Sequence, residues 1–180
     1  MIADSHSFAN NIIEGNLGSK IQGEVVLKFN YPWSMSFIDN DHLLVATKPG
    51  KLWLVDSFGS KTEVKNIMKV QYGGQGGMGD VVPHPNYKKN KLIYLSYITS
   101  DDGGKTRYAV VDRAKLSDLN SPKLENRQRI WEQFPAVKGK GHFSHRIVFG
   151  PEGSAHENKI FITSGDRQMQ HPAQMWETNF

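Results

Sequence analysis

Cysteine is absent from the 180-residue sequence. The chain therefore cannot form disulfide bonds, use a thiol as a nucleophile, or hold zinc or an iron–sulfur centre through thiolates. This absence does not reveal the cellular compartment in which the protein works.

Long apolar runs are missing as well. No window approaches the roughly 18 apolar residues of a membrane-spanning helix, and the start, MIADSHSFANNIIEG, lacks a basic region followed by an apolar core. We therefore expect no membrane span, and no export signal is visible.

Charge of one sign is not concentrated anywhere. The 22 Lys and Arg residues face 18 Asp and Glu, and the basic residues are scattered among the acidic ones. Because a nucleic-acid-binding groove requires clustered basic residues, we expect no nucleic-acid partner.

Short apolar runs dominate what is present. From residue 24 onward, runs rich in Val, Ile, Leu and aromatic residues alternate with Gly, Pro, Asn and Asp clusters, which is typical of an all-β protein. The sequence predicts a lead-in segment over residues 1–23 and a β domain over residues 24–180, with no convincing amphipathic helix longer than about ten residues. Besides the hairpin described next, strands are expected at residues 91–98, 107–116, 146–149 and 159–165.

The clearest hairpin is LLVATKPGKLWLVD, residues 43–56. Pro49 presets φ for the second position of a turn, and Gly50 supplies the positive φ of the third. The pattern predicts a type II turn over Lys48–Lys51.

Three segments repeat one pattern, in which an apolar strand, a turn and a strongly apolar strand follow one another. They are SMSFIDNDHLLVAT, DVVPHPNYKKNKLIYLSY and RIVFGPEGSAHENKIFITSG, with turns near residues 39, 83 and 150. Such recurrence predicts the blades of a β-propeller. Because a propeller usually closes with four to eight blades, the roughly three visible here predict part of a larger propeller. A compact four-bladed ring is the alternative.

The segment GQGGMG, residues 74–79, matches the glycine pattern of dinucleotide-binding loops. Those loops open a helix, whereas Pro83 and Pro85 follow here and disfavour one. The glycines instead allow the backbone to pass close to a neighbouring strand or a ligand. Gln75, within this loop, can offer an amide donor and acceptor to a polar ligand.

His142 and His145 are candidates for chemistry, with His156 and His171 downstream. A zinc site would need these imidazoles to converge, but positions i and i+3 of an extended segment point to opposite faces. A general base is the other possibility for His142, because a histidine titrates near neutral pH. A structural loop histidine is the simplest alternative.

Two further expectations concern packing. Arg146, at the start of an apolar strand, is expected to bury its stem and pair with a carboxylate such as Asp166. The aromatic residues expected in the core are Trp33, Phe37, Trp53 and Tyr94.

Three segments in the same order resemble the N-terminal half of the soluble pyrroloquinoline-quinone-dependent sugar dehydrogenases, the glucose/sorbosone dehydrogenase family. They are YPWSMSFIDNDHLLVATKPGKLWLVD, GGQGGMGDVVPHPNYKKNKLIYLSY and GHFSHRIVFGPEGSAHENKIFITSGDR. The resemblance covers roughly residues 24–174. It implies a six-bladed β-propeller of about twice this length.

The resemblance also implies a quinoprotein that oxidises the anomeric hydroxyl of an aldose to a lactone. His142 would be the general base, Gln75 would line the substrate pocket, and hydride would pass to pyrroloquinoline quinone (PQQ). Gly141 stands where the glucose-oxidising branch has an aspartate, so the aldose sugar dehydrogenase branch is the better match. Family members work in the periplasm or outside the cell and pass electrons to an external acceptor.

In the family, later blades supply the arginines, the lysine and the bound Ca²⁺ that hold the cofactor. We therefore expect a truncated N-terminal fragment that is inactive or very weak alone, with blade edges and apolar surface exposed. The alternative function is a non-catalytic propeller-type binding module, for which His142→Asn would leave ligand affinity nearly unchanged.

Overall fold

The structure is a computed structural model that describes residues 11–169. The chain divides into two compact units between Asn30 and Tyr31. In the first, β1 (Asn11–Glu14) pairs with β2 (Lys20–Gly23) in an antiparallel hairpin. None of the helices in the described residues has the length and apolar character that crossing a bilayer requires.

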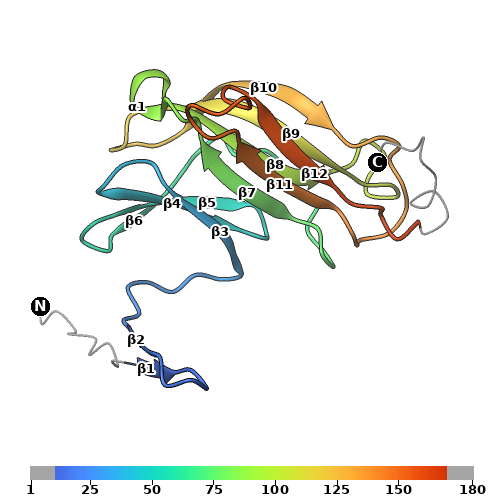
Figure 1. The fold of residues 1–180 in the computed structure, drawn as a ribbon. Coiled ribbons are helices and arrows are strands. Elements are labelled where there is room, and N and C mark those ends of the chain that lie inside the picture. The colour runs from blue at the N-terminus through green and yellow to red at the C-terminus, as the bar shows by residue number, and fades with distance from the viewer. Residues whose placement is uncertain (1–10, 170–180) are drawn as a thin grey trace, which may run out of the picture. The chain divides into compact units, whose positions relative to one another are not determined.

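The second unit is built from three antiparallel sheets (Figure 1). The first contains β3 (Pro32–Phe37), β4 (His42–Thr47), β5 (Lys51–Asp56) and β6 (Lys61–Glu63). The second contains β7 (Met78–Pro83), β8 (Leu92–Thr99), β9 (Tyr108–Leu116) and β10 (Leu124–Glu132). The third contains β11 (Ser144–Phe149) and β12 (Ile160–Ser164), and a one-turn helix, α1 (Tyr87–Asn90), joins β7 to β8.

The predicted repeat is confirmed as three antiparallel hairpins, β3–β4, β7–β8 and β11–β12, each of which begins a sheet. In the first two sheets the four strands lie in chain order, which is the architecture of a propeller blade. The described residues thus form two blades and the first two strands of a third.

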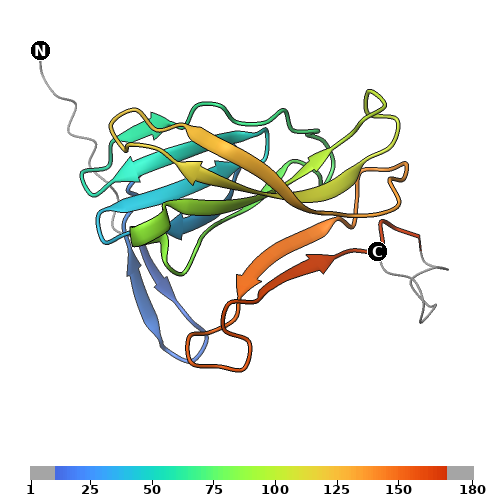
Figure 2. The same ribbon diagram turned by 90° about the horizontal axis from the view of Figure 1, so that it is seen from above.

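Strand β7 lies between the other two sheets and contacts β3 and β4 on one side and β11 on the other (Figures 1 and 2). The hydroxyls of Ser34 and Ser36 donate to the carbonyls of Gly79 and Val81, each across 2.7 Å. Because β7 and β11 pack together, the loops that precede them meet at one end of the sheets.

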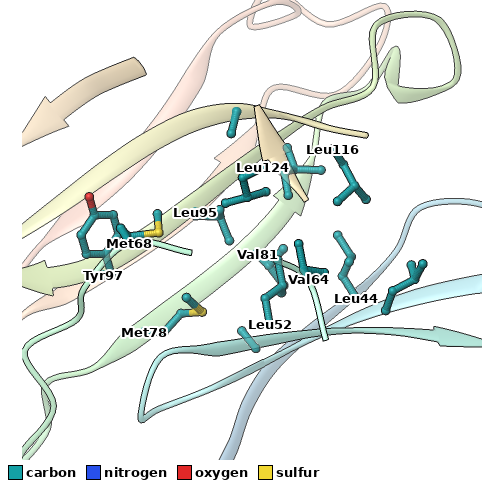
Figure 3. Close-up of a cluster of buried hydrophobic side chains, with 14 of the residues drawn as sticks. Leu44, Leu52, Val64, Met68, Met78, Val81, Leu95, Tyr97, Leu116 and Leu124 are labelled. Atoms are coloured by element: carbon teal, nitrogen blue, oxygen red, sulfur yellow. The ribbon is translucent and has the colours of Figure 1, made fainter. Parts of the chain in front are cut away.

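A hydrophobic core fills the space between the first and second sheets (Figure 3). Leu44 and Leu52 of the first sheet and Ile93 and Leu95 of the second are completely buried. Each such side chain contributes about 1.5–3 kcal/mol to folding relative to leaving it exposed. A smaller cluster around Ile147 packs the third sheet on the second.

The hairpin predicted over residues 43–56 is confirmed, but its turn lies one residue earlier than expected. Gly50 has the predicted positive φ, 106°, while its N–H donates to the Thr47 carbonyl at 2.9 Å, which closes the turn over Thr47–Gly50. The Lys48 carbonyl, which the predicted turn needed, instead accepts the N–H of Met78. Tertiary pairing with the β7 segment therefore decides the position of the turn.

The prediction that four aromatic residues lie in the core is right for Tyr94 alone, which is buried. Trp53 is half-buried, and Trp33 and Phe37 are exposed to 53% and 67%. The reason is the strand face. Ser34 and Ser36 of β3 point to β7, so the alternate residues face the opposite side, which the other two sheets of the second unit leave uncovered.

Candidate active site

Gln75 lies in the loop that precedes β7, where close backbone approach explains the glycines. A Cβ on Gly74, whose φ is 58°, would lie 2.7 Å from the Lys140 carbonyl oxygen, and one on Gly77 would lie 2.3 Å from that of Lys48. Side chains do not tolerate such distances, so these positions require glycine. The segment continues into β7, a strand, and not into the helix of a dinucleotide-binding loop.

His142 lies in the loop that precedes β11, and Asp166 follows the end of β12. Because β11 and β12 are antiparallel partners, the start of one strand and the end of the other meet. The His142 Nδ1 atom lies 2.7 Å from Asp166 Oδ1, and the imidazole is half exposed. The sequence analysis predicted Asp166 as a partner of Arg146. The structure instead pairs Asp166 with His142.

The state of Asp166 determines the proton positions on His142. The Gln168 backbone N–H and, next, the His142 imidazole lower the pKa of Asp166 below its ordinary value. An ionised carboxylate can only accept hydrogen bonds. In the neutral imidazole, Nδ1 therefore carries the proton and donates it to Asp166, and Nε2 keeps a free lone pair.

Gln75 and His142 touch, although 67 residues separate them. The Gln75 Oε1 atom accepts the backbone N–H of His142 at 2.6 Å. The Gln75 backbone N–H donates to the Lys140 carbonyl at 2.8 Å, so the two loops are joined twice. With Oε1 occupied, the amide nitrogen of the exposed Gln75 side chain remains as a donor.

His145 lies apart from this exposed group. It is 5% exposed, and its Nδ1 atom lies 2.9 Å from Ser96 Oγ on β8. Burial, which disfavours the charged imidazolium, lowers the pKa of His145 to about 4. His142 and His145 do not converge, and no group of three or more His, Asp or Glu residues within 11–169 could hold a metal ion. His171 lies outside the described residues.

The prediction for Arg146 is right that the side chain pairs with a carboxylate, but wrong on which carboxylate and on the burial of its stem. Its side chain is 67% exposed and pairs with Asp80 of β7, Nη1 to Oδ1 at 2.9 Å, not with Asp166. Asp80 is buried, and its second oxygen accepts the Ile147 N–H at 2.8 Å. The carboxylate thus links β7 to β11, and adjacent packing of these two strands selects the partner of Arg146.

Comparison with known proteins places this arrangement in a family. Residues 29–180 match the family model described as Glucose / Sorbosone dehydrogenase. The chain belongs to the glucose/sorbosone dehydrogenase family. The aldose sugar dehydrogenase YliI of Escherichia coli (strain K12) is 31% identical over 150 residues, which are 82% of this chain and 38% of YliI.

Solved structures of the glucose/sorbosone dehydrogenase type agree with the fold. The apo form of the Escherichia coli aldose sugar dehydrogenase superposes with a TM-score of 0.71 at 28% identity, covering 81% of this chain and 40% of that one. The PQQ-bound aldose sugar dehydrogenase of Streptomyces coelicolor shares the fold, with a TM-score of 0.58 at 21% identity over 76% of this chain and 45% of that one. These values confirm the predicted propeller fold class. The chain spans about two fifths of the length of these relatives.

Proposed function

We propose that the complete protein is a quinoprotein oxidoreductase that oxidises the anomeric hydroxyl of an aldose to a lactone, with PQQ as the hydride acceptor. The observation that carries this proposal is the meeting of His142, Asp166 and Gln75 in one exposed site. Relatives named aldose sugar dehydrogenases support the substrate class. An external electron acceptor would complete the catalytic cycle.

In this proposal His142 is the general base. Asp166 holds the Nδ1 proton, so Nε2 can accept the proton of the sugar hydroxyl as C1 is oxidised. The imidazolium that forms is stabilised by the adjacent carboxylate, in the way that an aspartate supports the histidine of a hydrolase triad. Proton abstraction therefore needs no residue beyond those that the structure brings together.

Gln75 is proposed to bind the substrate. Its carbonyl oxygen is occupied by the His142 N–H, so its NH₂ group is the part that can donate to a sugar hydroxyl. This arrangement would place a hydroxyl-binding donor next to the base. Positioning of this kind is a major source of catalytic rate.

The described residues can account for proton abstraction and sugar binding, but they do not fit the cofactor. PQQ carries three carboxylates and the family binds it with Ca²⁺, yet no group of three or more carboxylate or histidine residues within 11–169 could hold a metal ion. Lys48 and Arg167, cations that contact these loops, already donate to backbone carbonyls. We infer that cofactor and Ca²⁺ binding requires further residues, and that the 180-residue chain alone is inactive or nearly so.

The periplasm or the cell exterior is the proposed location. This proposal is based on the resemblance to the family, whose members work there.

A chimera tests the proposal. Residues 29–180 would replace the matching part of the Escherichia coli aldose sugar dehydrogenase, and dye-linked oxidation of an aldose panel would be measured with and without PQQ and Ca²⁺. We expect cofactor-dependent turnover that falls by about 10²- to 10⁴-fold in the His142→Asn chimera, the range that general-base catalysis contributes. A folded chimera that oxidises aldoses equally well with asparagine at position 142 would refute the role of His142. Binding of sugars without turnover, unchanged by the substitution, would favour a binding module.

A further inference from the structure

Arg167 is a buried cation without an acidic partner among the described residues. It is 2% exposed, and its guanidinium donates to the backbone carbonyls of Gly141 at 3.1 Å, Gly139 at 3.4 Å and Arg107. Burial and, next, the charge of Arg107 lower the pKa of Arg167 to about 10, so the group remains protonated at neutral pH. Burying a charge without a counter-ion is costly, and a lone buried arginine therefore needs an explanation.

Its contacts surround the proposed base on both sides in the sequence. Gly141 precedes His142, and the ring of Phe143, which follows it, lies 3.8 Å from the guanidinium carbon. The Arg167 backbone N–H donates to the His142 carbonyl at 3.2 Å. Both chain neighbours of His142, and its own carbonyl, are thus in contact with this arginine.

The same guanidinium also reaches the segment that holds Gln75. Its acceptors Gly139 and Gly141 flank Lys140, whose carbonyl accepts the Gln75 N–H. An arginine that fixes residues 139–141 therefore supports both joints between the two loops.

The backbone held in this way is strained. His142, Ser144 and His145 have φ values of 50°, 60° and 63°, in the left-handed region that residues other than glycine rarely adopt. Such conformations persist only where surrounding contacts over-determine them. For His142, Arg167, whose own φ is 55°, supplies contacts to the carbonyl and to the residues on either side.

Charge alone does not account for this arrangement. The guanidinium is planar, so it can stack on Phe143 while its separate N–H groups reach different carbonyls, which a lysine ammonium cannot do. Asp166, the residue before, contacts the His142 ring. Adjacent residues thus hold the ring and the backbone of one histidine.

We propose that Arg167 is a positioning residue, which holds the loop of His142 in its strained conformation through backbone carbonyls and the Phe143 ring. The proposal rests on the proposed function in that His142 is the group to be positioned. It assigns Arg167 no contact with substrate or cofactor.

The experiment uses the isotope-labelled 180-residue chain and NMR, without substrate or cofactor. The readouts are the protonation pattern of the His142 ring nitrogens and the hydrogen-exchange rate of the His142 backbone N–H. In Arg167→Lys and Arg167→Met we expect loss of the single Nδ1–H form and exchange faster by about tenfold or more, because hydrogen bonds from a charged donor are lost. The Arg167→Lys variant is not expected to keep the wild-type signals, because lysine retains the positive charge but lacks the planar guanidinium with its separate N–H groups.

Arg129→Lys is the matched control. Arg129 donates to the buried Asp112 at 2.6 Å within the second sheet, so its replacement costs stability without touching the His142 loop. Equal changes at His142 in the Arg167 and Arg129 variants would reduce the effect to general destabilisation and overturn the proposal. Wild-type signals in Arg167→Met would also overturn it.

A measurement on the wild-type chain covers the case in which the variants do not fold. If Arg167 holds the loop, its Nε–H and the His142 N–H become exposed in the same opening event, so the two exchange rates, each corrected for the intrinsic rate of its group, give the same opening free energy. Different opening free energies would contradict the proposal. Since none of these readouts requires turnover, a folded chimera that keeps His142 and is inactive with PQQ and Ca²⁺ would refute the proposed function and leave the role of Arg167 to be judged separately.

Discussion

The contact between His142 and Asp166 gives the histidine a defined chemical orientation. A free imidazole exchanges its proton between two nitrogens, whereas an ionised carboxylate at 2.7 Å retains it on Nδ1. The consequence at the scale of the residue is an imidazole whose accepting nitrogen, Nε2, faces away from Asp166.

Replacing Asp166 with Asn tests this orientation. An amide can present its NH₂ group to Nδ1 and so favour the wrong tautomer, as in the aspartate-to-asparagine change of a serine-protease triad. In the chimera described above we expect kcat to fall by about 10²-fold or more, with substrate affinity little changed. Steady-state kinetics of Asp166→Asn beside Asp102→Asn, an exposed carboxylate in another loop, would check this. A kcat loss shared by both variants would argue against a specific role.

At the scale of the elements, His145 connects β11 to the second sheet. Its ring packs so closely on β7 that a Cβ at Gly79 would lie 2.0 Å from His145 Cε1. The Ser96 hydroxyl beside it also accepts the Asp80 N–H at 2.7 Å. The neutral imidazole thus fills a fitted space between β7, β8 and β11.

This burial predicts a pH dependence of stability. The pKa of His145 is about 4 when folded and about 6.5 when unfolded. Between these values the unfolded chain binds a proton that the folded chain does not, so the free energy of unfolding decreases as pH falls from about 6.5 to about 4. The contribution is about 3 kcal/mol across this window.

Urea denaturation at several pH values would measure it, with His145→Gln as the comparison. The variant should be less stable at neutral pH but show a flatter profile over this window, because glutamine does not titrate. A profile as steep as that of the wild type would assign the pH dependence to other groups, such as His84, whose pKa burial also lowers.

At the scale of the whole second unit, apolar side chains lie exposed on the first and third sheets. On β3 these are Trp33, Met35 and Phe37, and on the third sheet they are Val148 and Phe161. Contiguous apolar surface of this kind marks an interaction site or an aggregation risk. The edges of sheets carry a similar risk.

We therefore expect the 180-residue chain to self-associate. Sedimentation velocity at increasing concentration should show oligomers, and Met35→Lys combined with Phe37→Glu should reduce them, since both positions face away from the core. Phe58→Ser, which removes a single exposed aromatic residue from a loop, is the control and should change nothing. A wild-type chain that stays monomeric at high concentration would contradict the expectation.

Several features were predictable from the sequence because they depend on neighbours in the chain. Alternation of apolar runs and turn residues located the hairpins β4–β5, β7–β8 and β11–β12. The positive φ of Gly50 followed from its place beside Pro49. Family resemblance, not spacing, brought Gln75 and His142 together as candidates, and the structure places them in direct contact.

Other features depended on which strands pack side by side, and the sequence does not encode these in any local pattern. Arg146 pairs with Asp80 and not Asp166 because β7 lies against β11. Trp33 and Phe37 looked like core residues, since apolar alternation identifies a face of a strand without showing what covers it.

By itself, the sequence determined an all-β chain built of repeated hairpins, since turn chemistry and side-chain alternation act over a few residues. Only the tertiary structure decided that Asp166 orients His142 and that Arg167 supports its backbone. These contacts join residues about 25 positions apart through the antiparallel return of β12 beside β11. Long-range contacts of this kind follow from strand pairing and packing, which no single segment specifies.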